Sequence, residues 1–173
     1  MESNWKKTSD ELLRITFDAA NMDAPYRTRE CVIDKTLRIA SNVISSKDEN
    51  IGQSSPTARY GCLRWSKEAY DLYLSFRKEG MSHKQACYAK VNGKSPYINE
   101  HEYPLSIVKK SLLNGNWNLD KLKEYMYSYG SFTVVTKEED RRLKTVTTIH
   151  EGKARYSNAG INVLNLKEDN ETE

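Results

Sequence analysis

The sequence predicts an α+β protein that is mostly helical, with about six short helices, and that ends in a small antiparallel β-sheet. Two observations lead to this fold class. Before residue 130, apolar residues recur every three or four positions, and the segments between them contain Gly, Pro, Ser and Asn. After residue 130, β-branched and aromatic residues form short runs separated by charged turns. The order of helix, turn, helix and hairpin makes the predicted fold winged-helix-like.

The first 50 residues are predicted to form a helical hairpin. Thr8 and Glu11 have the spacing of a capping box, and an apolar stripe follows them as far as Ala20. Pro25 interrupts this stripe, and a second one runs over about 27–45. Two amphipathic stripes this close in sequence are typical of paired helices. We expect the pair to serve in oligomerisation or in docking a protein partner.

Residues 45–61 have no hydrophobic periodicity and are rich in Ser, Gly, Asn and Asp. We expect a loop here, with residues 51–61 as a linker to a second domain over 62–166. The end of the chain, 167–173, contains four acidic residues and is expected to be a disordered acidic tail.

Four short helices are expected in the second domain, each bounded by turn residues. Ser66 and Asn118 are predicted caps, Ser82 and Gln85 form a literal capping-box pair, and Pro104 is placed at a helix start. The approximate ranges are 66–79, 82–92, 104–114 and 118–129.

Three strands are expected after these helices. The segments are SFTVVT at 131–136, RRLKTVTTIH at 141–150 and GINVLNL at 160–166. The acidic run at 137–140 is interpreted as the turn of a hairpin between the first two strands.

The composition is 38% hydrophobic and 29% charged, with a net charge of +3. Because the tail contributes four negative charges, residues 1–167 carry +7, which suits a surface that binds a polyanion. No apolar run approaches the roughly 18 residues that a membrane span needs, and the N-terminus lacks the apolar centre of a secretory signal. Three cysteines are too few and too widely spaced for a disulfide framework. We therefore expect a cytoplasmic protein without membrane contact.

The favoured function is nucleic-acid binding, with DNA as the expected ligand and regulation as the expected role. The helix at 118–129 would enter the major groove, and the hairpin would lay its cations along the phosphates. The residues predicted to contact nucleic acid are Lys109, Lys110, Lys121, Lys123, Tyr127, Lys137, Arg141, Arg142 and Lys144.

Residues 138–154, EEDRRLKTVTTIHEGKA, resemble the wing of the MarR-type regulators. In that family, Asp-Arg-Arg precedes an alternating strand that ends in a Thr-x-x-Gly turn. The wing arginine of the family reaches into the minor groove, so the resemblance implies this role for Arg141 or Arg142. The resemblance covers under a tenth of the chain.

Other ligands remain open. The stretch EGMSHKQACYAKVNGKSPY at 79–97 is a second candidate for a helix-turn-helix, although a poorly basic segment follows it. Phe132 and Tyr156 are candidate stacking platforms for single-stranded nucleic acid. Eleven tyrosines and three tryptophans also suit a non-enzymatic adaptor or inhibitor that binds another protein. The tryptophans are Trp5, Trp65 and Trp117.

No cofactor and no catalytic residue is expected, and the sequence contains no P-loop, GxGxxG or GxSxG motif. His83 and Cys87 have the spacing of a zinc half-site that Cys62 and His101 would have to complete. Because CxxC and HExxH motifs are absent, we expect no metal. A metal-dependent nuclease is the distant alternative, and its candidate residues are Glu138, Glu139, Asp140, Lys144 and His150.

Overall fold

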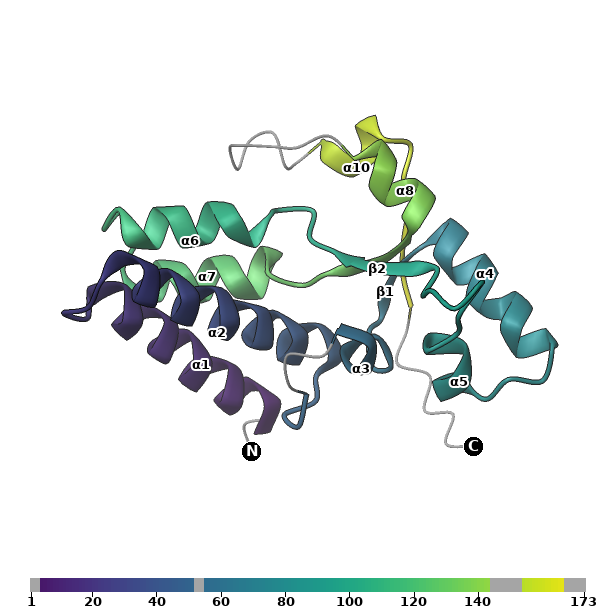
Figure 1. Cartoon of the computed structure of the whole chain (residues 1–173), viewed down its shortest axis with the longest axis horizontal. Helices are drawn as coiled ribbons and strands as arrows, with labels where there is room; N and C mark the ends of the chain where they lie inside the picture. The colour runs from purple at the N-terminus through teal and green to yellow at the C-terminus, as the bar shows by residue number, and fades with distance from the viewer. Residues whose placement is uncertain (1–3, 52–54, 144–153, 167–173) are drawn as a thin grey trace.

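The computed structural model describes residues 4–51, 55–143 and 154–166, which form a mixed α+β fold (Figure 1). A helical bundle lies at one end of the molecule. It consists of α1 (Asn4–Asn21), α2 (Tyr26–Ser46), α6 (Leu105–Leu113) and α7 (Leu119–Tyr129). Two helices, α4 (Lys67–Lys78) and α5 (His83–Cys87), lie at the other end. A small sheet lies between these two parts (Figure 1), so the predicted fold class is confirmed.

Where the sequence predicts an N-terminal hairpin, α1 and α2 pack against each other on either side of Pro25. The pair does not have a hydrophobic core of its own. Leu13 and Leu37 of the hairpin belong to the same buried cluster as Val108 and Leu122, which come from α6 and α7. The predicted division at 51–61 therefore does not coincide with a boundary between hydrophobic cores.

The predicted linker contains structure that the sequence did not indicate. Helix α3 (Ser55–Arg59) and strand β1 (Arg64–Ser66) lie within or next to it. Ile51, Ala58 and Trp65 are buried in a second core, together with residues of α4, α5 and the sheet. Ile51 and Ala58 of the predicted linker are consequently part of this second core.

The four predicted helices of the second half are all present, and their caps are largely those expected. The Ser66 side chain accepts from the backbone N–H of Ala69, and Ser82 and Gln85 form a complete capping box. Helix α5 is shorter than predicted and ends at Cys87. Gly93, predicted to end this helix, instead lies in a tight turn several residues later.

The sheet is mixed rather than antiparallel, with the strand order β2-β3-β1-β4. Its other strands are β2 (Tyr97–Glu100), β3 (Thr133–Thr136) and β4 (Val163–Asn165). Strands β3 and β4 were predicted. The parallel pairing of β1 with β3, with Trp65 opposite Val134, was not predicted because β1 has only three residues and shows no periodicity.

The predicted wing hairpin is wrong where the structure describes it. The acidic run interpreted as a turn is the first part of helix α8 (Lys137–Arg142). A capping box starts this helix: Thr136 accepts from the backbone N–H of Glu139, whose side chain accepts from the backbone N–H of Thr136. Arg141 and Arg142 are therefore helical, and residues 144–150 of the predicted strand lie outside the described residues. The acidic tail also lies outside them.

Candidate functional site

Several of the cations predicted to contact nucleic acid are engaged in contacts inside the bundle. The Lys109 ammonium on α6 lies 3.1 Å from a carboxylate oxygen of Glu30 on α2. The Lys123 ammonium on α7 lies 3.2 Å from Asp10 on α1, and the Tyr127 hydroxyl donates to the same carboxylate at 2.9 Å. These side chains join neighbouring helices, and their charges are offset by nearby acids.

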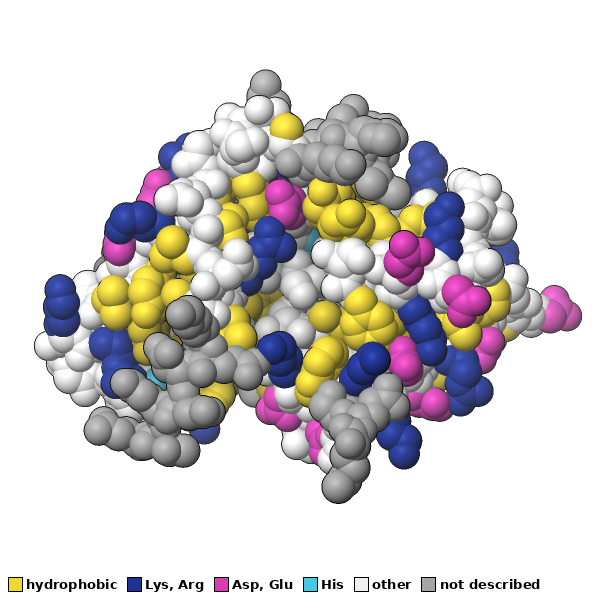
Figure 2. Space-filling view, turned by 180° about the vertical axis from the view of Figure 1, so that it is seen from behind, with side chains coloured by type: hydrophobic (Ala, Val, Ile, Leu, Met, Phe, Trp, Pro, Cys, Tyr) yellow, Lys and Arg dark blue, Asp and Glu magenta, His cyan; other side chains and the backbone are white. Residues whose placement is uncertain are grey.

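Two further cations of the predicted set also belong to the bundle. Lys110 is exposed on α6, and the Lys121 ammonium lies 5.6 Å from the centroid of the Trp117 ring. The face shown in Figure 2 has basic and acidic side chains interspersed over the bundle. A polyphosphate ligand would meet alternating charge on this face.

The predicted cations of α8 are also close to carboxylates. Arg141 forms an ion pair with Glu138, one helical turn away, and the Arg142 guanidinium lies 2.8 Å from Glu68 on α4. Lys144 lies outside the described residues. The described members of the predicted set are therefore divided between the bundle and α8.

The structure does bring part of this set to a cleft of about 690 Å³. The cleft lies between α4, the segment 91–96 and the start of α8. Its volume falls in the range of ligand-binding pockets. Residues that line it include Leu72, Val91, Lys94, Pro96, Lys137 and Arg141. Of these, the sequence had indicated only Lys137 and Arg141.

One wall of the cleft is a tight turn that fixes the backbone of Lys94. The backbone N–H of Val91 donates to the Lys94 carbonyl at 2.9 Å, and the N–H of Lys94 donates back at 3.1 Å. Asn92 and Gly93, between them, both have positive φ (53° and 76°). This is the Asn-Gly pattern of a type I′ turn, so the dipeptide in the sequence was the signal for this wall.

The opposite wall is attached to the same segment. The backbone N–H of Lys137, the first residue of α8, donates to the carbonyl of Pro96 at 3.0 Å. Strand β2 starts directly after Pro96, and its pairing with β3 places Tyr97 opposite Thr136. The two lysine-bearing walls are thus joined through the first residue of β2 and the last residue of β3.

A buried arginine lies behind the lining. Arg59 is only 3% exposed and donates to the Asn99 side chain at 2.9 Å, the Cys87 carbonyl at 3.0 Å and the Ser95 hydroxyl at 3.3 Å. Burial lowers the pKa of its guanidinium from the ordinary value. No carboxylate pairs with it among the residues that the structure describes. Because Ser95 lines the cleft, this cation stands immediately behind the cleft surface.

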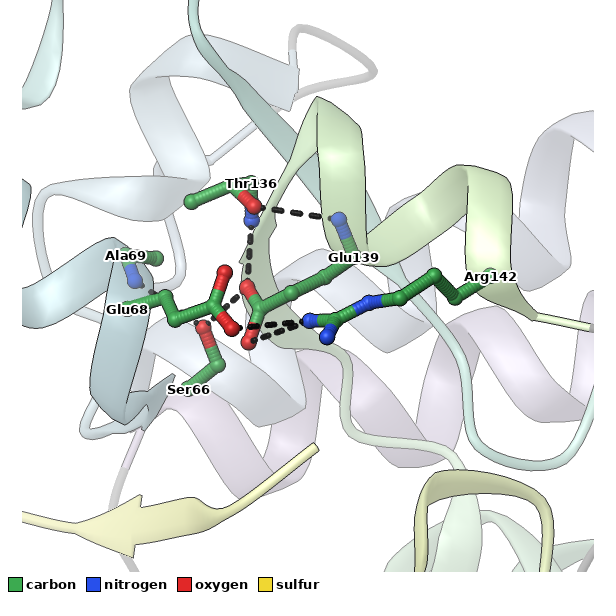
Figure 3. A network of polar contacts seen from close by, with 6 residues as sticks. All are labelled: Ser66, Glu68, Ala69, Thr136, Glu139 and Arg142. Carbon is green, nitrogen blue, oxygen red and sulfur yellow. Dashed lines mark hydrogen bonds and ion pairs between the residues drawn. The ribbon is translucent and has the colours of Figure 1, made fainter. Parts of the chain in front are cut away.

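A buried carboxylate holds α8 against α4 (Figure 3). Glu139 is 1% exposed, and it accepts from the Ser66 hydroxyl at 2.5 Å and from the backbone N–H of Thr136 at 2.8 Å. Ser66 in turn caps α4, so one carboxylate joins the starts of both helices. Arg142 approaches it at 4.0 Å while pairing with Glu68.

Ser41 and His101 form a hydrogen-bonded pair that links elements of the fold. The Ser41 hydroxyl donates to the Gly130 carbonyl at 2.6 Å and lies 2.6 Å from Nε2 of His101. Because the serine proton is already used, Nε2 must carry the imidazole proton and donate to Ser41. Burial lowers the pKa of His101 to about 4, so the ring is neutral at physiological pH. Nε2 of His101, the residue after β2, thus links the end of this strand to α2, and the Ser41 hydroxyl links α2 to Gly130 after α7.

His83 and Cys87, the spacing of which allows a zinc half-site, are not joined by further ligands among the described residues. The Cys87 sulfur lies 3.8 Å from Nδ1 of His83, but Nδ1 also lies 2.9 Å from the Tyr73 hydroxyl. Within 4–51, 55–143 and 154–166, no three His, Cys, Asp or Glu side chains gather as metal ligands. Burial raises the pKa of the Cys87 thiol to about 12, which keeps it protonated and a poor nucleophile.

The aromatic residues are mostly buried. Trp65 and Trp117 are 2% and 8% exposed, so they serve the cores rather than an interface. Phe132 and Tyr156, the predicted stacking platforms, are buried as well. The large exposed apolar or aromatic residues in the described part of the chain are Ile15, Met22, Tyr26, Tyr60, Leu74, Val91 and Tyr129. Ile15 and Tyr26 belong to the N-terminal helices, and Met22 lies in the connection between them. Docking through this pair of helices stays a prediction.

Comparison with protein-family models, with curated proteins and with solved structures finds no match to this chain. Among the residues that the structure describes, no helix combines the length and the apolar character needed to cross a bilayer.

Proposed function

We propose that the chain is a non-enzymatic adaptor or inhibitor that binds a segment of another protein in the cleft between α4, residues 91–96 and α8. One observation carries this proposal: the cleft combines apolar side chains with charged and polar groups on a preformed backbone. Leu72, Val91 and Pro96 offer apolar contact, and Lys94 and Lys137 offer ammonium groups. A few polar groups placed around an apolar surface are typical of sites that recognise a specific ligand.

The fixed walls support binding with little loss of conformational entropy. The turn that carries Val91 is closed by two backbone hydrogen bonds, and α8 is held to α4 through buried Glu139. A site whose backbone is already ordered loses less conformational freedom when a flexible segment docks. The proposed binding takes place in the cytoplasm, which is the location expected from the sequence.

The test begins with selection of random peptides, displayed on phage, against the immobilised chain. Enriched peptides are then synthesised with a fluorophore, and their affinity is measured by fluorescence anisotropy. Val91 is 47% exposed, so Val91→Glu changes the cleft without disturbing a core. We expect this variant to weaken binding about tenfold or more, because it places a carboxylate against the apolar part of the ligand.

The matched control is Leu74→Glu. Leu74 lies on α4, is 37% exposed and does not line the cleft, so its replacement adds the same charge elsewhere. We expect this variant to bind as the unmodified chain does. Equal affinities for the Val91 and Leu74 variants, or a selection that enriches no peptide, would contradict the proposal.

Nucleic-acid binding is a second proposal, favoured by one observation. Lys94, Lys137 and Arg141 line the same cleft, and residues 1–167 carry a net positive charge. Its support is weaker because several of the other predicted cations are paired with acids. Its test is the binding of a labelled DNA duplex at low salt, with loss of binding as the salt concentration rises.

A further inference from the structure

We infer that the segment bound in this cleft is acidic, and that the ammonium groups of Lys94 and Lys137 bind its carboxylates. This inference rests on the proposed function and adds the chemical class of the ligand.

The lining of the cleft carries positive charge that no acidic residue of the described chain offsets. Glu68 is paired with Arg142, and Glu138 is paired with Arg141, so both lining acids are already neutralised. Lys94 and Lys137 have no ion-pair partner in the described part of the chain. The cleft therefore presents two uncompensated ammonium groups.

The buried guanidinium of Arg59 stands behind the lining. Arg59 donates to Ser95, which lines the cleft, and to two other neutral oxygens. Its neighbours on the described chain offer no formal negative charge. A buried charge is screened much less by salt than an exposed one. Arg59 thus adds to the positive potential at this wall of the cleft.

Backbone hydrogen bonds fix the main chain of both lysines. Lys94 closes the type I′ turn, and the backbone of Lys137 is bonded to Pro96, two residues after Lys94. Both backbones are fixed, so only side-chain freedom is lost when an anion binds between them. Two lysines on the lining of one cleft suit the capture of one or two carboxylates.

The apolar part of the lining favours an acidic protein segment over nucleic acid. Leu72, Val91 and Pro96 form an apolar part of the lining next to the lysines. A peptide can supply an apolar side chain beside its carboxylates. A nucleic acid would bring a continuous run of phosphates, which is more negative charge than the two unpaired lysines of the described lining can offset. The combination favours an acidic segment that contains at least one apolar residue.

The test uses the full chain and fluorescein-labelled probes measured by anisotropy at low salt. The acidic probe is a peptide with one leucine between two runs of glutamate, and its neutral match has glutamine in place of each glutamate. A labelled single-stranded DNA of similar length and a DNA duplex are the nucleic-acid probes. We expect the acidic peptide to bind about tenfold more tightly than the neutral one, and this preference to fall as salt is raised.

The variant is the double substitution Lys94→Gln with Lys137→Gln, which leaves the backbone hydrogen bonds in place. Its control is Lys84→Gln with Lys110→Gln, which removes two exposed lysines outside the cleft lining. We expect the first variant to abolish the preference for the acidic peptide. The control should keep most of it, although both variants lower the net charge equally.

The outcomes separate the inference from the proposed function. If acidic and neutral peptides bind equally and Val91→Glu weakens both, the inference is wrong and the cleft still binds peptides. If neither these peptides nor any selected peptide binds, both fail. If DNA binds through Lys94 and Lys137 while the acidic peptide does not, the inference is overturned in favour of nucleic acid.

Discussion

Replacement of Glu139 by alanine tests whether one buried carboxylate holds α8 against α4. The carboxylate accepts two hydrogen bonds, from the Ser66 hydroxyl at 2.5 Å and from the Thr136 N–H at 2.8 Å. A hydrogen bond to a charged group contributes about 1.5–3 kcal/mol. The alanine variant also leaves these buried donors without an acceptor. We therefore expect the free energy of unfolding to fall by about 3–5 kcal/mol.

Glu138→Ala is the matched control, because Glu138 precedes Glu139 on the same helix but its side chain is 74% exposed. Its ion pair with Arg141 lies in solvent and is expected to contribute less than about 1 kcal/mol. Both variants remove one carboxylate from the first turn of α8, so the effect on the helix dipole is similar. The difference between the two variants measures the buried network.

The assay is urea denaturation followed by circular dichroism, with the slope of the unfolding free energy against urea compared among variants. For a chain of this length, a loss of about 4 kcal/mol lowers the melting temperature by about 8–16 °C. Glu139→Gln, which keeps one acceptor oxygen, should lie between the unmodified chain and the alanine variant. It also provides a measurement if the alanine variant does not fold. Unfolding free energies within about 1 kcal/mol for Glu139→Ala and Glu138→Ala would refute the reasoning.

Three further predictions concern the cores. The pKa of His101, about 4 against the ordinary 6.5, means that its neutral form stabilises the fold above pH 6.5 and that this contribution, about 3 kcal/mol, is lost as the pH falls toward 4. The stability advantage over His101→Gln should therefore shrink between pH 6.5 and pH 4.5 in urea titrations, and a constant advantage would contradict the prediction. Gly130→Ala should lower the unfolding free energy by about 1–3 kcal/mol, because the added Cβ would lie 2.5 Å from the Met126 carbonyl oxygen; a change below about 0.5 kcal/mol would disprove this steric conflict. In a titration with Ellman's reagent, exposed Cys31 should react quickly in the native protein, and buried Cys62 and Cys87 only after denaturation. Fast reaction of more than one native thiol would be incompatible with this burial.

The elements that the sequence predicted correctly are those set by local chemistry. Ser82 and Gln85 are three residues apart, and their reciprocal hydrogen bonds depend on little else in the fold. The same kind of signal was present at Thr136 and Glu139, but the charged run 137–140, which includes Glu139, was interpreted as a turn. The local cap was the better predictor, because Asp and Glu stabilise the first turn of a helix.

The features that the sequence did not predict depend on contacts between distant segments. The parallel pairing of Trp65 with Val134 joins two short strands that are separated by four helices. Lys109 and Glu30 lie far apart in sequence, and only the packing of α6 on α2 brings them together. A count of basic residues could not anticipate this pairing. The prediction of a basic face depended on that count. In the structure, Lys109, Lys123 and Arg142 are each paired with an acidic residue.

The cleft depends on the same non-local contacts, which links its stability to its function. Its three walls belong to α4, to the turn at 91–94 and to α8, and two anchors hold them together. Glu139 joins α8 to the start of α4, and the Pro96 carbonyl accepts from Lys137 at the first residue of α8. Glu139 does not line the cleft, so a Glu139→Gln variant that remains folded keeps every lining side chain. If a preformed cleft is what binds the ligand, this variant should bind the acidic peptide more weakly than the Glu138→Gln variant, even though Glu138 lines the cleft. The opposite order would indicate that the lining charges alone determine affinity and that the walls need not be held in place.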